Sequence, residues 1–315
     1  NRVAADWDVI RDYDRENMRG GNSWLHLGKP SNLERCFCIR LRRNFGQNLI
    51  SIGEDEELQA SVLFHAIASF RLQPERKIYI LADENDDIFL KYETQLRRLG
   101  NEEDVELITD YGDICRTVCE LQQEMYSRRR VQKKQNIMVF WLGMDNMALE
   151  FSFYPEQKPE SLKAISGSQK KKNPASSLNM MSELDSMFAS FFGDDSPAAP
   201  APEPQVPETE EEDEEDILYN ATEDIAELVG EGPKRGIHHF LFMPSFLPLK
   251  KARFLKLENF LCKIGFQMDE ESSVDYFGKR GLTRNLEAGQ AAYYDGGKFS
   301  RNFLPYKLTD EVMAG

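Results

Sequence analysis

Short apolar runs alternate with helical patterns along most of this chain, and this alternation constrains the fold more than any other feature. The run 137–142 (IMVFWL) has the length and composition of one buried strand. Strands that alternate with helices build parallel sheets, so the sequence predicts an α/β fold with a mainly parallel sheet. The predicted strands are 36–41, 48–52, 77–82, 105–108, 137–142, 237–243, 262–268, 291–294 and 298–306. The predicted helices are 56–71, 87–99, 113–130 and 221–231, with a helix or edge segment at 250–260.

A long polar segment, 156–216, interrupts this pattern. Between residues 156 and 220 the chain has 5 Lys and 15 Asp or Glu, together with a Pro/Ala tract. Such a composition buries too little apolar area to offset chain entropy, so we expect a disordered insertion. The flanking parts, 25–155 and 217–315, are then two halves of one domain, and 1–24 is an N-terminal extension.

One stretch of the insertion, 178–192, has apolar residues at helical spacing. It is either a short helix that docks into a partner's groove or a helix that packs back onto this domain. The residues on its apolar face are Leu184, Met187, Phe188 and Phe191.

The net charge of −15 argues against a large surface that grips duplex DNA, although a local basic patch remains possible. The densest basic cluster in the expected folded part follows the predicted helix 113–130. It either contacts nucleic acid or complements the dipole at the end of that helix. Its members are Arg128, Arg129, Arg130, Lys133 and Lys134.

Five cysteines show no CxxC pair, so we expect free thiols and no metal site. Cys36 and Cys38 alternate in a predicted strand, an arrangement that needs further ligands to bind zinc. There is no run of 18 apolar residues, and we expect a cytoplasmic protein without a membrane segment. Because the sequence begins at Asn1 rather than at Met, we expect the C-terminal piece of a longer polypeptide.

The strand, turn and helix around Gly53 have the layout of a phosphate-binding loop. Such a loop ends in Gly-Lys-Ser/Thr, where the lysine binds phosphate and the hydroxyl binds magnesium. Here Gln59 stands at the position of the lysine and Ala60 at that of the hydroxyl. Four carboxylates lie between the turn and Gln59, and they would repel a triphosphate. They are Glu54, Asp55, Glu56 and Glu57.

Five segments resemble, in the same order, motifs of the FtsK/SpoIIIE/HerA group of RecA-like motor ATPases. They are LHLGK at 25–29, NLISIG at 48–53, GPKRGIHHFL at 232–241, ENFLCKIGFQM at 258–268 and GQAAYY at 289–294. The resemblance implies a RecA-like (P-loop NTPase-like) three-layer sandwich, here interrupted by the disordered insertion.

The same resemblance implies that the nucleotide site is degenerate. The family's acidic pair after the strand 137–142 is replaced by Gly143 and Met144, with Asp145 two residues late. The family's phosphate sensor appears as Met243-Pro244 and its arginine motif as 272–274 (SSV). Phosphoryl transfer depends on these charges, so we expect no catalytic residue and no cofactor, with ATP and magnesium bound only if the degenerate site still holds them. The expected vestigial pocket comprises Gly53, Glu54, Glu57, Gln59, Ala60, Gly143, Asp145 and Gln267.

The sequence therefore predicts a non-catalytic, pseudo-ATPase C-terminal module of a FtsK/HerA-like DNA-translocating ATPase. Its role would be structural, regulatory or partner-recruiting. The implied partners are an ATPase domain of the same or a sister polypeptide, double-stranded DNA through the full-length protein, and further copies in an oligomer. One alternative is the substrate-binding degenerate module of a type VII-like secretion ATPase. A second alternative is a nucleotide sensor that binds without hydrolysis.

Overall fold

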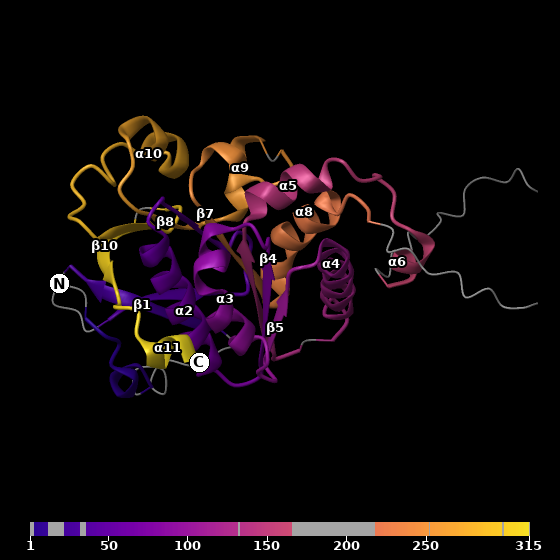
Figure 1. Cartoon of the computed structure of the whole chain (residues 1–315), viewed down its shortest axis with the longest axis horizontal. Helices are drawn as coiled ribbons and strands as arrows, with labels where there is room; N and C mark the ends of the chain where they lie inside the picture. Colours follow the sequence, from indigo (N-terminus) through magenta and orange to yellow (C-terminus); the bar gives the residue numbers. More distant parts are fainter. Residues whose placement is uncertain are drawn as a thin grey trace, which may run out of the picture. The chain divides into compact units, whose positions relative to one another are not determined.

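Strands from both halves of the sequence join in one ten-stranded sheet (Figure 1). The computed structural model describes residues 3–11, 22–31, 36–131, 133–165, 218–251, 253–297 and 299–314. The order across the sheet is β2-β1-β10-β9-β8-β3-β7-β6-β4-β5. The strands are β1 (Ser23–Pro30), β2 (Phe37–Leu41), β3 (Leu49–Ile52), β4 (Arg76–Ala82), β5 (Val105–Ile108), β6 (Asn136–Leu142), β7 (Ile237–Met243), β8 (Cys262–Gly265), β9 (Ala291–Tyr294) and β10 (Ser300–Pro305).

The six strands β8, β3, β7, β6, β4 and β5 are parallel. The remaining four, β9, β10, β1 and β2, extend the sheet on the β8 side through antiparallel pairs. The predicted α/β fold with a mainly parallel sheet is therefore confirmed. The halves on either side of the insertion share this sheet, because β7 from the second half lies between β3 and β6 from the first.

Helices cover the two faces of the sheet and make the three layers that the sequence predicts. The helices are α2 (Glu56–Arg71), α3 (Asp87–Leu99), α4 (Tyr111–Ser127), α5 (Met144–Phe151), α6 (Glu160–Ile165), α8 (Thr222–Glu231), α9 (Leu247–Lys251), α10 (Glu270–Phe277) and α11 (Asp310–Ala314), with 3-10 turns η1 (Gly232–Arg235) and η2 (Leu257–Asn259). In Figure 1, α2, α3 and α11 lie on one side of the central strands, and α4 and α8 lie on the other.

The central strand β6 shows why the sheet is buried on both faces. Phe140 and Leu142 belong to the apolar cluster that includes α2 and α3. Val139 and Trp141 belong to the cluster on the other face, with α4 and α8. Alternate side chains of a strand point to opposite faces, so a strand covered on both sides needs an unbroken apolar run. This is the pattern seen at 137–142 in the sequence.

The predicted boundaries differ from the structure in several places. The strand β1 begins at Ser23, within the stretch expected as an N-terminal extension, and β8 ends at Gly265 rather than at residue 268. The predicted helix 113–130 forms as α4 but begins two residues earlier, because Asp110 caps it by accepting the amide of Asp113. The short helices α5, α6, α10 and α11 were not predicted. α6 lies within the expected disordered insertion 156–216, so the structure corrects the start of that segment: residues 156–165 belong to the described part of the domain. The apolar motif at 178–192 lies outside the described residues. No helix in the described ranges is long and apolar enough to cross a membrane.

Candidate functional site

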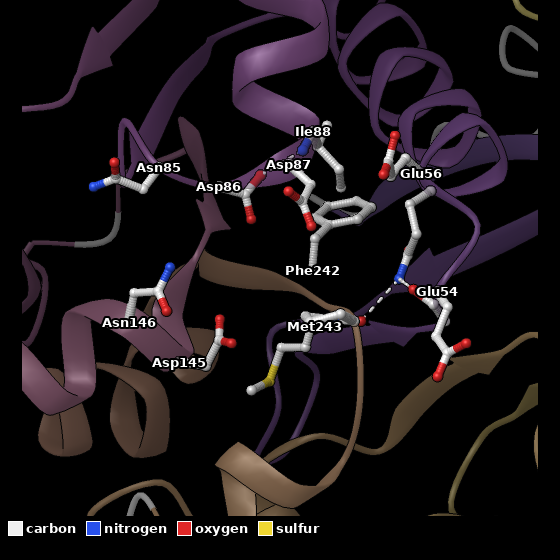
Figure 2. Close-up of a pocket in the computed structure, with 13 residues that line it drawn as sticks. Glu54, Glu56, Asn85, Asp86, Asp87, Ile88, Asp145, Asn146, Phe242 and Met243 are labelled. Carbon is white, nitrogen blue, oxygen red and sulfur yellow. Dashed lines mark hydrogen bonds between the residues drawn. The ribbon is translucent and has the colours of Figure 1, made fainter.

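A hollow of about 170 Å³ lies at the carboxyl ends of β3, β4, β6 and β7. Ligands in open α/β sheets bind at this edge, outside the carboxyl ends of the parallel strands. Figure 2 shows Asp86 and Asp145 with their carboxyl groups directed toward the same space, to the left of Phe242 and Met243 in this view. The lining residues are Gly53, Glu54, Glu56, Gln59, Asn85, Asp86, Asp87, Ile88, Asp145, Asn146, Phe242, Met243 and Pro244.

The side chain of Gln59 fills the turn between β3 and α2. Gln59 is 1% exposed, and its amide nitrogen donates to the main-chain oxygens of Met243 at 3.0 Å and of Gly53 at 3.2 Å. Its amide oxygen accepts from the hydroxyl of Ser51. One uncharged side chain thus links the ends of β3 and β7 at the position where a phosphate-binding lysine is expected. These bonds fix the carbonyl groups of the turn toward Gln59, whereas a phosphate cradle presents amide hydrogens.

The turn itself is too short to form a phosphate cradle. Between the end of β3 at Ile52 and the start of α2 at Glu56 there are only three residues. Asp55 caps the helix, and its carboxylate accepts the amide of Leu58 at 3.0 Å. A helix N-terminus attracts a phosphate because its first amides lack partners and carry partial positive charge. In this chain the carboxylate of Asp55 already occupies the position of the phosphate at the start of α2.

Gly53 is required by its close approach to Phe266. A Cβ atom at residue 53 would lie 2.5 Å from the ring of Phe266, so a larger residue would force the turn and β8 apart. The amide of Gly53 also donates to the carbonyl of Met243 at 3.2 Å. The turn glycine is thus explained by packing.

The electrostatic character of the hollow is acidic. Among its described lining residues are five carboxylates, from Glu54, Glu56, Asp86, Asp87 and Asp145, and no lysine or arginine. The exposed Lys91 on α3 pairs with the lining residue Glu56 at 3.0 Å, so its charge is already balanced. A polyphosphate is negatively charged and needs positive charges around it to bind. Here the lining residues carry negative charge, which repels such a ligand.

Asp86 and Asp145 carry perturbed carboxyl groups. Burial raises the pKa of Asp86 to about 6, against the lowering effect of the amides of Ile88 and Phe89, which it caps. The neighbouring Asp145 raises the pKa of Asp86 further. Burial also raises the pKa of Asp145. Two carboxylates that both resist ionisation indicate a site where negative charge is already unfavourable.

Asp145 reaches the hollow from the end of β6 through a left-handed residue. Gly143 has φ +74°, and a Cβ atom there would lie 2.7 Å from the Cβ of Asp83. α5 begins directly after it at Met144, which places Asp145 in the first turn of that helix. The acid is therefore presented by a helix, and it faces Asp86 across the hollow rather than a cation.

The structure places four of the eight residues expected in the vestigial pocket along the hollow: Gly53, Glu54, Gln59 and Asp145. The other four do not line it. Glu57 is exposed in the first turn of α2, Ala60 is a buried residue of the same helix, Gly143 is covered by Asp83, and Gln267 is exposed two residues beyond β8.

The group Asn85, Asp86, Asp87 and Ile88 was not predicted from the sequence to line this site. These residues follow the predicted strand 77–82, and its carboxyl end lies at the same edge of the sheet as the other parallel strands. The polar residues 83–87, directly after a buried strand, were the signal in the sequence that could have identified this part of the site. They do not belong to the motor-ATPase motifs from which the pocket was predicted.

A second hollow, of about 400 Å³, is basic and lies near the amino-terminal ends of β6 and β7. We call it the basic hollow. Its lining residues are Arg43, Arg128, Arg129, Arg130, Lys133, Lys234 and Arg235. Four members of the cluster predicted from the sequence line it, while Lys134 contributes only a carbonyl that accepts from Arg43.

Several of these cations hold the fold together. Arg128, 4% exposed, pairs with Glu124 at 2.7 Å and donates to the carbonyl of Arg235. Arg43 is partly buried; burial and then the nearby Arg128 lower its pKa. Arg130 and Arg235 line the hollow and form no ion pair with any described residue. The arrangement leaves positive charge available there in an otherwise acidic chain.

No known protein family matches this sequence, and neither does any curated protein. Solved structures do share its fold. The cytoplasmic domain of EssC matches with a TM-score of 0.53 and 12% identity, over 95% of this chain and 46% of that one. The cytoplasmic domain of the Thermomonospora curvata type VII secretion ATPase EccC matches with a TM-score of 0.51 and 12% identity, over 91% of this chain and 29% of that one.

A structure of EssC ATPases 2 and 3 from Geobacillus thermodenitrificans matches with a TM-score of 0.50 and 10% identity, over 92% of this chain and 46% of that one. The chain thus spans less than half the length of these structures. At such low identity the likeness shows the fold alone. It confirms the predicted RecA-like, P-loop NTPase-like architecture.

Proposed function

We propose that this chain is an ATPase-like module that does not hydrolyse ATP and that serves a larger motor as a structural, regulatory or partner-recruiting part. The observation that carries the proposal is Gln59. A lysine at that place would supply a charge to the phosphates, whereas Gln59 is buried and its amide is engaged by main-chain oxygens at the ends of β3 and β7.

The surroundings of Gln59 support the same proposal. Asp55 occupies the amides at the start of α2, and the hollow beside it is lined by carboxylates without a cation among the residues the structure describes. Each electrostatic contribution to phosphoryl transfer is worth about 3 kcal/mol or more, so their joint absence removes most of the catalysis. The larger motor would be a FtsK/HerA-like DNA translocase, in which this module packs against an active ATPase domain.

Calorimetric titration with magnesium-ATP tests this proposal directly. We expect no saturable heat up to about millimolar ATP from the wild type. The comparison protein carries Gln59→Lys and Ala60→Thr, and we expect it also to show none, because the three-residue turn and the Asp55 cap persist. Saturable micromolar binding by the wild type would contradict the proposal and favour the nucleotide-sensor alternative.

The type VII alternative draws support from the solved structures of similar fold. EccC is described as a type VII secretion ATPase, and one EssC structure is described as ATPases 2 and 3 of that protein. This module would then bind an exported substrate at its acidic hollow. Binding of a cationic helical peptide that weakens in Asp145→Asn, measured by fluorescence anisotropy, would favour this alternative over DNA translocation.

The basic hollow favours nucleic acid as a second candidate partner of this module. Clustered arginines attract a phosphate backbone, and removing one arginine that binds a phosphate lowers the salt dependence of binding by about one. The double variant Arg130→Gln/Arg235→Gln should therefore weaken duplex DNA binding and reduce the slope of log K against log salt by about two. The matched control is Arg280→Gln/Arg284→Gln, which removes two exposed arginines elsewhere. Equal effects of both variants would reject a specific role of the basic hollow.

A further inference from the structure

Three metal-binding side chains meet on the first two strands of the sheet. His26 lies on β1 directly opposite Cys38 on β2 in the antiparallel register. Cys36 directly precedes β2, two residues before Cys38. The ligand atoms of His26, Cys36 and Cys38 all lie within 4.8 Å of one another. Within the described residues, no other group of three such ligands is this close.

This donor set suits a zinc ion. Zinc binds thiolate sulfur at about 2.3 Å and imidazole nitrogen at about 2.0–2.1 Å in a tetrahedron, so its ligand atoms lie about 3.3–3.8 Å apart. From the observed limit of 4.8 Å, the ligand atoms need to approach one another by at most about 1.0–1.5 Å, within the reach of side-chain torsions on a fixed backbone. We propose that His26, Cys36 and Cys38 form a binding site for a zinc ion with one coordination position left for a further ligand.

Burial and access at the three residues fit a bound ion. His26 is fully buried and Cys36 is 8% exposed, which would keep two ligands in fixed positions. Cys38 is partly exposed, so the site has an entry path from solvent.

The remaining cysteines do not share this arrangement. Cys115 and Cys119 lie one turn apart on the same face of α4, and the Cys119 sulfur lies 2.7 Å from the hydroxyl of Tyr219. Cys262 accepts from the hydroxyl of Tyr293 at 3.4 Å. The Cys115 thiol donates instead to the main-chain oxygen of Tyr219 at 3.6 Å. Within the part of the chain described, none of these three cysteines belongs to a group of three metal-binding side chains. They provide matched controls.

A metal at this site would fasten the edge of the sheet. β2 is the terminal strand, and an edge strand is held by neighbours on one side only. Ligands from β1 and β2 would cross-link the two strands through the ion. Because the thiols bind as thiolates, zinc binding should release about two protons and weaken as the pH falls.

The test uses the whole chain, freed of metal by a chelator, and titrated with cobalt(II) and with zinc(II). We expect about one cobalt per chain, with the sulfur-to-cobalt charge-transfer absorption and the visible bands of a tetrahedral site. Loss of an outer-shell partner weakens metal binding by about 10–100-fold. Cys38→Ser and His26→Asn each remove a direct ligand, so we expect a larger loss of affinity. Cys115→Ser, which removes a buried thiol outside the cluster, should leave cobalt and zinc binding unchanged.

A measurement on the unmodified protein keeps the test decisive if a variant fails to fold. One equivalent of zinc should slow alkylation of Cys36 and Cys38, followed by mass spectrometry, and leave the rates at Cys115, Cys119 and Cys262 unchanged. Absence of stoichiometric metal binding, binding that survives Cys38→Ser, or binding without protection of Cys36 and Cys38 would each overturn the proposal.

Discussion

Asp86 offers the sharpest test of how the acidic hollow shapes stability. It is 9% exposed, caps α3 through the amides of Ile88 and Phe89, and faces Asp145. Asp86→Asn keeps the shape and the capping oxygen, since Asn caps helices as well as Asp, and removes only the charge. We expect this variant to be more stable than the wild type at neutral pH.

The magnitude follows from the pKa of Asp86, which burial raises from 3.8 to about 6. The folded protein then holds a proton that the unfolded chain releases between pH 4 and 6, so the free energy of unfolding falls as the pH rises through that window. At 1.36 kcal/mol for each unit of pKa, the ionised carboxylate costs about 3 kcal/mol above pH 6. The variant should gain about 2–3 kcal/mol there and nothing below pH 4.

Urea unfolding from pH 4 to pH 8 measures this difference. The buried histidines act in the opposite direction, because burial lowers the pKa of His238 to about 4 and that of His239 to about 3. Their contribution is present above about pH 6.5 and is lost as the pH falls, but it cancels between variant and wild type. The control Asp110→Asn changes an exposed cap of α4 and should shift stability by under about 0.5 kcal/mol. A gain that is independent of pH, or a loss at pH 7, would refute the reasoning.

Three further substitutions test the packing at the two ends of β3 by chemical denaturation. Gln59→Leu should cost about 2–4 kcal/mol, because main-chain oxygens at the ends of β3 and β7 lose their buried donor. Gly53→Ala should cost about 1–3 kcal/mol through the contact with Phe266, and Phe266→Leu should recover part of that loss in the double variant. Asn48→Ala should cost about 2–4 kcal/mol, because the buried amide joins three segments, whereas the exposed Asn101→Ala should cost under about 0.5 kcal/mol. Equal costs for Asn48→Ala and Asn101→Ala, or full stability of Gln59→Leu, would contradict these assignments.

The central sheet could be predicted from the sequence because its strands are buried on both faces. A run such as 137–142 is apolar at every position, so its burial on both faces can be read directly from the sequence. The helix α2 also forms at the predicted bounds, 56–71. β1 was missed because SWLHLGKP contains polar residues that read as a loop, although Ser23 and His26 are buried by β2, β10 and α2. Burial by strands distant in sequence is a tertiary effect, which local pattern does not contain.

The site was predictable only in part for the same reason. The turn at Gly53 and the substitution at Gln59 are local features, and the sequence places them correctly next to one another. The acids after β4 and the pairing of His26 with Cys38 depend on which strands become neighbours. Sequence spacing identifies residues that share one strand or one helix. A site built from several strands of a sheet can be predicted only when the order of those strands is known.

The groups that would bind a nucleotide are already satisfied within this protein, and this sets an energetic threshold for any ligand. A phosphate at the turn would have to displace the hydrogen bonds of Gln59, each worth about 1 kcal/mol, and the Asp55 cap, worth about 1 kcal/mol more. A total of about 4 kcal/mol converts a micromolar ligand into a millimolar one before any charge repulsion is counted. Repulsion from Asp86 and Asp145 acts in the same direction. The hollow therefore favours a ligand or partner that brings positive charge or none, and a search for its physiological partner should begin with cationic peptides rather than with nucleotides.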